Sequence, residues 1–333
     1  MSCVAEHRVL VAGASGYSGA LAAALVDRHP GLELAFVTSR SNTGERLRDL
    51  YPHHRVDLVL EEFDAARHSE VDAAIVAYPH GASAPVVAAL RANGVKVVDL
   101  SADFRLRDRA TYEEWYVPHG APELLSEAVY GLPELYREEI RGAGLVANPG
   151  CYPTAALLAL APVADQLEEV VIDAKSGVSG AGREPTGVTH FVSIDENVHP
   201  YGVGHHRHMP EIDQELAAAG ATGIVAAFTP HLLPLDQGEL VSCYLKVDDP
   251  SGAPARFEER WGDERFVELT DRMPGVRDVR GTNLCRIHVH PDERTGRLFV
   301  FSAIDNLWKG ASSQAVQNLN LMLGLEEASG IEP

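Results

Sequence analysis

The stretch Arg8-Val-Leu-Val-Ala-Gly-Ala-Ser-Gly-Tyr-Ser-Gly19 joins a short apolar run to three glycines, Gly13, Gly16 and Gly19, spaced three residues apart. The apolar residues 8–12 predict a buried strand, and the alanine- and leucine-rich residues 20–29 predict a helix. A glycine turn between a strand and a helix lets the backbone approach a pyrophosphate, because the helix N-terminus offers free N–H groups and a positive dipole. We therefore predict a nucleotide site here, and the alternative is a plain tight turn.

The pattern of strands and helices supports this interpretation. Further apolar runs predict strands at residues 32–38, 73–77, 96–100 and 144–147, and a helix at 84–92. Strands that alternate with helices are typical of an α/β fold with a Rossmann-type, doubly wound parallel sheet.

The pattern changes after residue 150. Strands are predicted at residues 170–174, 223–229, 240–247, 284–290 and 297–304, and helices at 154–167, 211–219 and 311–323. Strand-rich sequence with few helices between strands favours a second, α+β domain with a mainly antiparallel sheet. We expect residues 1–150 and 308–333 to form the cofactor-binding domain, and residues 151–307 to form the catalytic, substrate and oligomerisation domain.

The residues after the second predicted strand indicate which cofactor binds. NAD sites usually place a carboxylate there to hold the ribose hydroxyls. This chain has Thr-Ser-Arg-Ser at residues 38–41 instead, so Arg40 could pair with a 2′-phosphate and hydroxyls such as that of Ser39 could donate to it. NADP(H) is therefore the expected cofactor, with Ser15 and Tyr17 of the glycine turn as further contacts. The alternative is that Arg40 is an ordinary solvated loop residue.

Composition excludes several classes of function. The 333 residues carry 48 Asp and Glu against 28 Lys and Arg, a formal net charge of −20, which argues against binding nucleic acid through a basic surface. There is no run of 18 apolar residues and no signal-peptide pattern, so neither a membrane span nor secretion is expected. The scattered cysteines (Cys3, Cys151, Cys243 and Cys285) fit neither a zinc site nor a Cys-x-x-Cys pair, so we expect no metal and a reducing, cytoplasmic setting.

Cys151 stands apart from the other cysteines. It follows Asn148-Pro-Gly150 and precedes Tyr-Pro-Thr154 and an apolar helical run, so it is expected at or just before a helix N-terminus. The helix N–H groups and dipole stabilise a thiolate there, whereas a free thiol with a pKa of about 8.5 is mostly protonated at neutral pH. From its position alone, Cys151 could be a reactive nucleophile or a small buried apolar residue.

Several motifs in a fixed order resemble those of the N-acetyl-γ-glutamyl-phosphate reductases, and more distantly the aspartate-semialdehyde and glyceraldehyde-3-phosphate dehydrogenases. The resemblance covers nearly the whole chain. Its motifs are the glycine turn at 13–19, Asp-Leu-Ser-Ala-Asp-Phe-Arg at 99–105, Tyr-Gly-Leu-Pro-Glu at 130–134, Ala-Asn-Pro-Gly-Cys-Tyr-Pro-Thr at 147–154, Ser-Gly-Val-Ser-Gly-Ala-Gly at 176–182, His-Arg-His-Met-Pro-Glu-Ile at 206–212 and Asp-Asn-Leu-Trp-Lys-Gly-Ala at 305–311.

The resemblance implies a defined reaction of arginine biosynthesis. The Cys151 thiolate attacks the acyl carbon of N-acetyl-γ-glutamyl phosphate, phosphate leaves, and hydride from NADPH reduces the resulting thioester to N-acetylglutamate 5-semialdehyde.

The resemblance also implies roles for other residues. A histidine in the 206–212 motif is the acid/base residue, and His206 is favoured over His208; the additional His205 blurs this choice. Glu211 would orient a histidine or bind substrate, and Asn306 would meet the nicotinamide amide.

The residues themselves indicate five more candidate ligand contacts. Arg105 follows the end of a predicted strand and is expected to contact the substrate phosphate, with Arg183 and Arg207 as rivals that could equally be surface residues. The glycine-rich turn that contains Ser179 and Gly180 could hold nicotinamide or phosphate through its backbone N–H groups.

Two alternatives remain open at this point. A relative in lysine biosynthesis acts by the same chemistry on an aminoadipyl phosphate, sometimes carried on an acidic protein. A protein that binds NADP as a sensor would keep the glycine turn without needing a reactive cysteine. The resemblance further implies a homo-oligomer, a tetramer or a dimer, built through the second domain's sheet.

Overall fold

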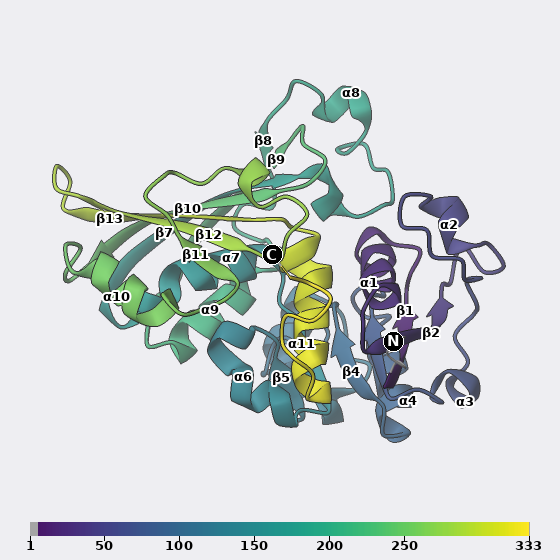
Figure 1. Cartoon of the computed structure of the whole chain (residues 1–333). Helices are drawn as coiled ribbons and strands as arrows, with labels where there is room; N and C mark the ends of the chain where they lie inside the picture. Colours follow the sequence, from purple (N-terminus) through teal and green to yellow (C-terminus); the bar gives the residue numbers. More distant parts are fainter. Residues whose placement is uncertain (1–5, 333) are drawn as a thin grey trace. The chain divides into compact units, whose positions relative to one another are not determined.

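The computed structural model describes residues 6–332 (Figure 1), which divide into two compact units. One unit comprises the chain up to residue 149 together with residues 311–332, and the other comprises residues 150–310. No helix within residues 6–332 is long and apolar enough to cross a bilayer.

The first unit is built on a six-stranded sheet in the order β2-β1-β3-β4-β6-β5. All five strand pairs are parallel. The strands are β1 (His7–Ala12), β2 (Leu32–Thr38), β3 (Ala73–Val76), β4 (Lys96–Asp99), β5 (Ala128–Tyr130) and β6 (Leu145–Ala147). The predicted parallel α/β sheet is therefore confirmed.

Helices cover both faces of this sheet. The main ones are α1 (Tyr17–Asp27), α4 (Ala84–Ala92), α6 (Pro133–Gly142) and α11 (Ser313–Leu323), and the short ones are α2 (Leu47–Leu50), α3 (Ala65–His68) and α5 (Arg109–Trp115), with a 3₁₀ turn at Pro122–Leu124. On one face, α4 packs on a cluster that includes Leu10, Ala74 and Val97. Elsewhere in the unit, α11 packs against α1, α6 and β4 (Figure 1).

The second unit contains a seven-stranded sheet in the order β11-β12-β13-β10-β7-β9-β8. The strands are β7 (Leu167–Gly177), β8 (His199–Pro200), β9 (Ala227–Leu233), β10 (Glu239–Val247), β11 (Val267–Leu269), β12 (Cys285–Asp292) and β13 (Arg297–Ile304). Four of the six strand pairs are antiparallel, and the β7–β9 and β11–β12 pairs are parallel. The sheet is mixed, and the expected mainly antiparallel α+β domain is confirmed.

The main helices of the second unit are α7 (Cys151–Leu160), α9 (Met209–Ala218) and α10 (Ala253–Trp261); α7 and α10 pack against the sheet, and α9 packs against α7. The shorter elements are α8 (Phe191–Ile194) and the 3₁₀ turns Ala161–Gln166, Val178–Ala181 and Val276–Asp278. A π-helical turn, Trp308–Ser312, precedes α11. Every residue of α7 after Cys151 is buried, because the helix packs against β10 and β13 on one side and α9 on the other.

Four features of the structure differ from the sequence-based expectations. The helix predicted at 154–167 begins at Cys151 and ends as an α-helix at Leu160, and a 3₁₀ turn that contains Pro162 follows it. The strand predicted at 223–229 is wrong by four residues, since a positive φ at Gly223 makes a turn and β9 begins at Ala227. The strand predicted at 170–174 is only the middle of β7. Sequence analysis missed α6 and α10, which are mostly polar helices with few buried residues.

Candidate active site

Cys151 is the first residue of α7, as predicted, and its N-cap is Gly150 in an extended conformation. The Gly150 N–H donates a 2.9 Å hydrogen bond to Oε1 of Glu211, in the first turn of α9. Glu211 is buried, so this bond fixes the chain where it turns into α7. Cys151 itself is partly exposed, which leaves its thiol accessible at a helix N-terminus.

Two glycines make room around Cys151. A Cβ on Gly310 would lie 2.8 Å from the Cβ of Cys151. A Cβ on Gly150 would lie 2.5 Å from Nε2 of His208, so that imidazole packs directly against the residue before the nucleophile. Both glycines are therefore required by the packing at the start of α7.

The two candidate histidines lie together beside α7. The His206 and His208 rings are 4.9 Å apart, and both contact the Tyr152 ring edge-to-face, at 5.7 and 5.9 Å. His208 is the N-cap of α9, whereas His206 lies in the turn before it. The structure thus brings Cys151 and both histidines into one cluster in the second unit.

Burial lowers the pKa of His206 to about 4, and the nearby positive charge of Arg207 adds to this effect. His206 is therefore neutral at pH 7. Its Nδ1 accepts a 3.2 Å hydrogen bond from the backbone N–H of His208, which sets the tautomer with the proton on Nε2.

Sequence analysis missed three residues of this cluster. Tyr152 and Tyr201 share a 3.0 Å hydrogen bond between their hydroxyls. Glu239, the first residue of β10, is completely buried, and burial raises its pKa to about 8. The only sequence signal for Glu239 is a charged residue at the start of an apolar strand, and such a signal cannot indicate which helix the strand packs against.

The glycine-rich turn at residues 176–182 contacts Asn306 through Ser179. Asn306 donates from Nδ2 to Oγ of Ser179 at 3.0 Å and accepts the Gly238 N–H at 2.7 Å. Gly180 lies beside them: its ideal Cβ position is 3.7 Å from Nδ2 of Asn306. Asn306 is only 3% exposed, so its amide holds this turn from the protein interior.

In the first unit, glycine is needed for different reasons at the three positions of the glycine turn. Gly13 has φ +88°, and a Cβ there would lie 2.6 Å from the carbonyl oxygen of Ala77. A Cβ on Gly19 would lie 2.2 Å from the carbonyl oxygen of Gly13. Gly16, the N-cap of α1, has no neighbour closer than 3.8 Å. The fold explains Gly13 and Gly19, whereas a Cβ on Gly16 would make only an ordinary van der Waals contact, so close approach of a ligand to the helix N-terminus is the reason that fits Gly16.

The residues after β2 form a compact turn against the glycine loop. Oγ of Ser39 lies 2.8 Å from Oγ of Ser15 and accepts the backbone N–H groups of Ser41 and Asn42. Ser39 is fully buried, so its hydroxyl holds the turn, while Arg40 is exposed beside it.

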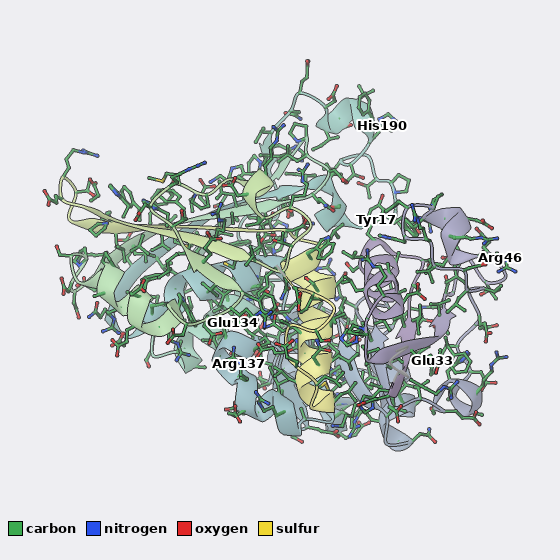
Figure 2. The ribbon with its side chains drawn as sticks, in the orientation of Figure 1. Tyr17, Glu33, Arg46, Glu134, Arg137 and His190 are labelled. Atoms are coloured by element: carbon green, nitrogen blue, oxygen red, sulfur yellow. The ribbon has the colours of Figure 1, made fainter. Side chains whose placement is uncertain are left out.

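Aromatic groups border the same turn. Tyr17, at the start of α1 (Figure 2), packs edge-to-face on Tyr51 with the ring centres 6.3 Å apart. Tyr51 donates its hydroxyl to the Ser15 carbonyl at 2.9 Å. Arg40 lies close enough to Tyr78 to lower its pKa, although burial raises that pKa overall.

The candidate substrate arginines differ in setting. Arg105 is 6% exposed, and it donates to the carbonyl oxygens of Asn148 and Leu100, each at 2.7 Å. These bonds tie the segment after β4 to the end of the β6 segment. Arg183 and Arg207 are exposed residues of the second unit.

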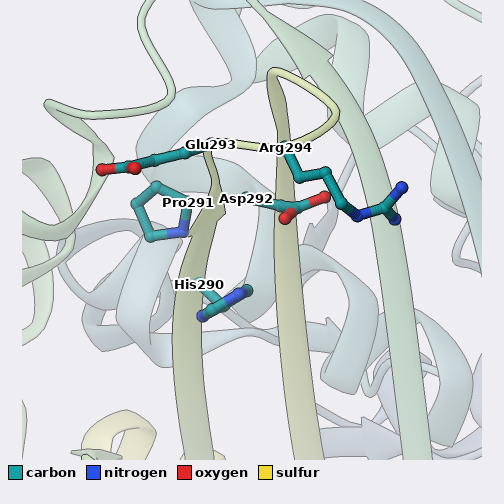
Figure 3. A pocket seen from close by; sticks show the side chains of 5 residues that line it. All are labelled: His290, Pro291, Asp292, Glu293 and Arg294. Atoms are coloured by element: carbon teal, nitrogen blue, oxygen red, sulfur yellow. The ribbon is translucent and has the colours of Figure 1, made fainter.

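The structure was also searched for metal-binding groups and for surface depressions outside the predicted site. Within residues 6–332 there is no group of three His, Cys, Asp or Glu side chains that could hold a metal ion. A shallow depression at the β12–β13 turn is lined by His290, Pro291, Asp292, Glu293 and Arg294 (Figure 3). None of these lining residues belongs to the predicted site.

Comparisons with known proteins match this arrangement. Residues 8–143 match the semialdehyde dehydrogenase NAD binding domain, and residues 151–306 match the semialdehyde dehydrogenase dimerisation domain. N-acetyl-gamma-glutamyl-phosphate reductase of Desulforudis audaxviator is 49% identical to this chain, with 97% of each chain covered. The enzyme of the same name from Syntrophobacter fumaroxidans is 48% identical, with 98% of each chain covered.

The chain belongs to the N-acetyl-gamma-glutamyl-phosphate reductase family. The predicted resemblance to these reductases is thus confirmed. Solved structures share the fold: aspartate semialdehyde dehydrogenase II of Vibrio cholerae, complexed with ASA, has a TM-score of 0.74 at 20% identity and covers 96% of this chain and 98% of its own. The NADP complex of the Candida albicans aspartate semialdehyde dehydrogenase has a TM-score of 0.67 at 14% identity, covering 95% and 98%.

Membership of this reductase family makes the protein an oxidoreductase with a nicotinamide cofactor. The family match extends over both units, so the glycine turn and the Cys151 cluster belong to its two matched domains.

Proposed function

We propose that the protein reduces N-acetyl-γ-glutamyl phosphate to N-acetylglutamate 5-semialdehyde and phosphate with NADPH, through a thioester on Cys151, in arginine biosynthesis. The observation that carries this proposal is the position of Cys151, partly exposed as the first residue of α7 and close to two histidines. The reductase relatives match over 97–98% of this chain, which supports the substrate assignment.

The acyl-transfer step follows from the Cys151 setting. The thiolate at the helix N-terminus attacks the acyl carbon, the bond from that carbon to the phosphate oxygen breaks, and the thioester remains. Because Glu211 holds the Gly150 N–H, the start of α7 keeps one geometry while the sulfur gains and loses its bond to carbon.

The histidine pair is proposed as the acid/base element, with His206 favoured over His208. A neutral imidazole whose Nε2 carries the proton can donate a hydrogen bond to an oxygen that gains negative charge. The Nδ1 contact with the His208 N–H leaves His206 in that tautomer at pH 7. Glu211 is proposed to position this pair as well as Gly150.

The first unit is proposed to bind NADP(H), and the residues there fit the group. The open N-cap at Gly16 can receive the pyrophosphate, and exposed Arg40 can pair with the 2′-phosphate. The cofactor, when bound, supplies the hydride that reduces the thioester. Gly13, Ser15, Tyr17, Gly19 and Ser39 shape this turn, and in the second unit Ser179, Gly180 and Asn306 are proposed nicotinamide contacts.

Substrate binding is proposed for three arginines. Arg105, Arg183 and Arg207 are the candidate partners for the carboxylate and phosphate of the substrate. Two of the Arg105 nitrogens donate to backbone carbonyls, and these bonds hold its guanidinium in a fixed orientation.

We also propose that the protein is a cytoplasmic homo-oligomer. Residues 151–306 match a dimerisation domain, and the sheet face opposite α7 carries a partly exposed aromatic pair, Tyr244 and Phe299, 5.4 Å apart. The cysteines within residues 6–332, Cys151, Cys243 and Cys285, form no disulfide, which fits a reducing compartment. Domain roles follow: cofactor binding in residues 1–150 and 308–333, catalysis and assembly in residues 151–307.

The decisive experiment is the reverse reaction. Wild-type protein with N-acetylglutamate semialdehyde, NADP⁺ and inorganic phosphate should form NADPH, and omission of phosphate should abolish steady turnover. Cys151→Ser should lose at least a thousandfold in rate, because a serine hydroxyl is hardly ionised at neutral pH. The aminoadipate semialdehyde analogue serves as the competing substrate, and faster turnover of that analogue would overturn the substrate assignment.

A further inference from the structure

Asp103 is a carboxylate in the loop between β4 and α5. Its side chain is completely buried in the first unit. Oδ1 accepts the Gly81 N–H at 2.7 Å, and Oδ2 accepts the Ala84 N–H at 2.9 Å. Ala84 is the first residue of α4, so Asp103 places its negative charge at the N-terminus of a helix from another segment of the chain. A buried charge is costly unless it is hydrogen-bonded, and these two donors offset that cost.

The residue that would ordinarily cap α4 has a different partner. Ser83 is the N-cap of this helix, but its hydroxyl donates to Asp99 at 2.5 Å instead of capping the helix. The Ser101 hydroxyl joins the two acids, since it donates to Asp99 at 2.6 Å and accepts the Asp103 N–H at 3.0 Å. Burial raises the pKa of Asp99 to about 6, and the nearby charge of Asp103 adds to this effect. The loop is thus joined to the end of β4 and to the start of α4.

Two rings hold the remaining polar atoms of Asp103. Tyr112 donates its hydroxyl to Oδ1 at 2.7 Å, and burial together with this bond raises the pKa of Tyr112. Nε2 of His119 donates to the Asp103 carbonyl oxygen at 2.5 Å, because Nδ1 of that ring accepts the Ala121 N–H and leaves the proton on Nε2. Every polar atom of Asp103 therefore has a partner, which is more than capping α4 requires.

The loop that Asp103 fixes ends at Arg105. The Arg105 N–H donates to the Ala102 carbonyl at 3.2 Å, so Asp103 lies inside a turn. The guanidinium closes the same loop: Nη2 donates to the Leu100 carbonyl and Nε to the Asn148 carbonyl, each at 2.7 Å. Because the arginine is bonded to the loop that it ends, the position of its guanidinium depends on where that loop lies.

We propose that Asp103 is a positioning residue: it holds the loop after β4 against the N-terminus of α4, and so holds Arg105 ready to receive the phosphate group of the substrate. This role rests on the acyl-phosphate reduction proposed above, in which Arg105 is a contact of that phosphate. A guanidinium that is already held in its binding orientation loses less entropy when phosphate binds. Asp103 therefore contributes to phosphate affinity without touching the ligand.

The alternative is that Asp103 only stabilises the fold, and two kinetic constants separate these roles. Loss of folded protein lowers the number of active molecules, so kcat falls while the phosphate KM stays the same. Loss of a pre-oriented arginine weakens phosphate binding, so the phosphate KM rises at nearly constant kcat.

The test is the oxidation of N-acetylglutamate semialdehyde by NADP⁺ with the concentration of inorganic phosphate varied. Asp103→Asn keeps the shape of the side chain but places an amide N–H₂ group where a backbone donor points. It should raise the phosphate KM about tenfold and leave kcat within about threefold of wild type. Asp64→Asn is the matched control, because Asp64 caps α3 through the Ala66 N–H and should change neither constant.

A double variant shows whether Asp103 acts through Arg105. Arg105→Ala should raise the phosphate KM by itself. Addition of Asp103→Asn should raise it no further, because the group that Asp103 positions is gone. Effects of the two substitutions that multiply would overturn the proposal, and so would an Asp103→Asn protein with a lower kcat and an unchanged phosphate KM.

Should Asp103→Asn fail to fold, Tyr112→Phe takes its place. This variant removes one hydroxyl donor to Asp103 and keeps the packing of the ring. The phosphate KM should rise about threefold, as expected for one lost hydrogen bond. An unchanged phosphate KM in the folded Tyr112→Phe protein would also overturn the proposal.

A second readout uses no substrate, so the two proposals can fail separately. Phenylglyoxal modifies arginine side chains, and peptide mass spectrometry follows the reaction at Arg105. Asp103→Asn should speed this modification about fivefold as the loop loosens, and Asp64→Asn should not. Faster modification in a protein that does not oxidise N-acetylglutamate semialdehyde would keep the hold of Asp103 on Arg105 and reject the substrate. Normal turnover, with the phosphate KM and the modification rate both unchanged in Asp103→Asn, would do the opposite.

Discussion

The Gly150 N–H donates to Oε1 of Glu211 over 2.9 Å, across 61 residues of sequence. This bond joins the N-cap of α7 to the first turn of α9, and so fixes the nucleophile's helix to the helix that follows the two histidines. Glu211 therefore positions the backbone at Gly150, directly before Cys151.

Glu211→Ala should lower the free energy of unfolding by about 1–3 kcal/mol, because a buried N–H loses a charged acceptor. Alkylation of Cys151 should slow in Glu211→Ala as the start of α7 loosens. Glu211→Gln keeps an acceptor oxygen, so its stability and its alkylation rate should lie between those of wild type and of Glu211→Ala. Urea unfolding and alkylation rates check this. Equal effects of alanine and glutamine would show that the hydrogen bond is not the cause.

Gly310 offers a steric prediction with a matched control. Gly310→Ala places a methyl group 2.8 Å from Cβ of Cys151, so α7 or the π-helical turn must shift, at a cost of about 1–3 kcal/mol. Gly187→Ala, in open space and without a positive φ, should change stability by less than about 0.5 kcal/mol. Thermal unfolding of both variants makes the comparison, and equal shifts would contradict the packing described at Cys151.

His206 should not titrate near neutrality. Its pKa of about 4 lies below the unfolded value of 6.5, so the unfolded chain takes up a proton first as the pH falls. Folding stability should therefore decline from pH 6.5 down to about 4, and the decline should be weaker in His206→Asn. NMR of the imidazole ring protons, assigned with this variant, measures the midpoint directly. A midpoint near 6.5 would refute the buried, neutral state.

The pKa of Glu239 has the opposite consequence for stability. It rises from 4.5 to about 8, so the unfolded chain ionises first, and folding stability should fall as the pH rises from about 4.5 to 8. Glu239→Gln removes this dependence, and at pH 8 it should be more stable than wild type by a few kcal/mol. At pH 5 the two proteins should be nearly equal. Urea titrations at several pH values test this, and parallel curves for the two proteins would count against a buried neutral carboxyl.

Arg40→Asp should reverse the cofactor preference. Loss of the cation and the added negative charge should weaken NADPH binding about a hundredfold, with little effect on NADH. Arg40→Lys, which keeps the charge without the planar fork, should lie between wild type and aspartate. Fluorescence titrations with both cofactors provide the measurement, and an unchanged ratio of affinities would remove Arg40 from the cofactor site.

Much of the site's location could be predicted from local sequence. The glycine turn after β1 and the Pro-Gly-Cys sequence before α7 depend on residues that are neighbours along the chain, where turn geometry and helix capping act. Short-range patterns of this kind also gave most strands of both sheets. They failed at β9, where a glycine turn displaced the strand, and at the polar helix α10, whose few apolar residues give a weak signal.

The sequence by itself determined that a cysteine would stand at a helix start and that a glycine turn would follow the first strand, because backbone conformation is set within a few residues. Only the tertiary structure decided what surrounds that cysteine. Glu211, Glu239 and Gly310 lie 60, 88 and 159 residues beyond Cys151 in the chain, and their contacts with its helix start depend on how α9, β10 and the last turn of the unit pack together. Burial then set the proton affinities of His206 and Glu239, since desolvation depends on the whole fold and on no local pattern.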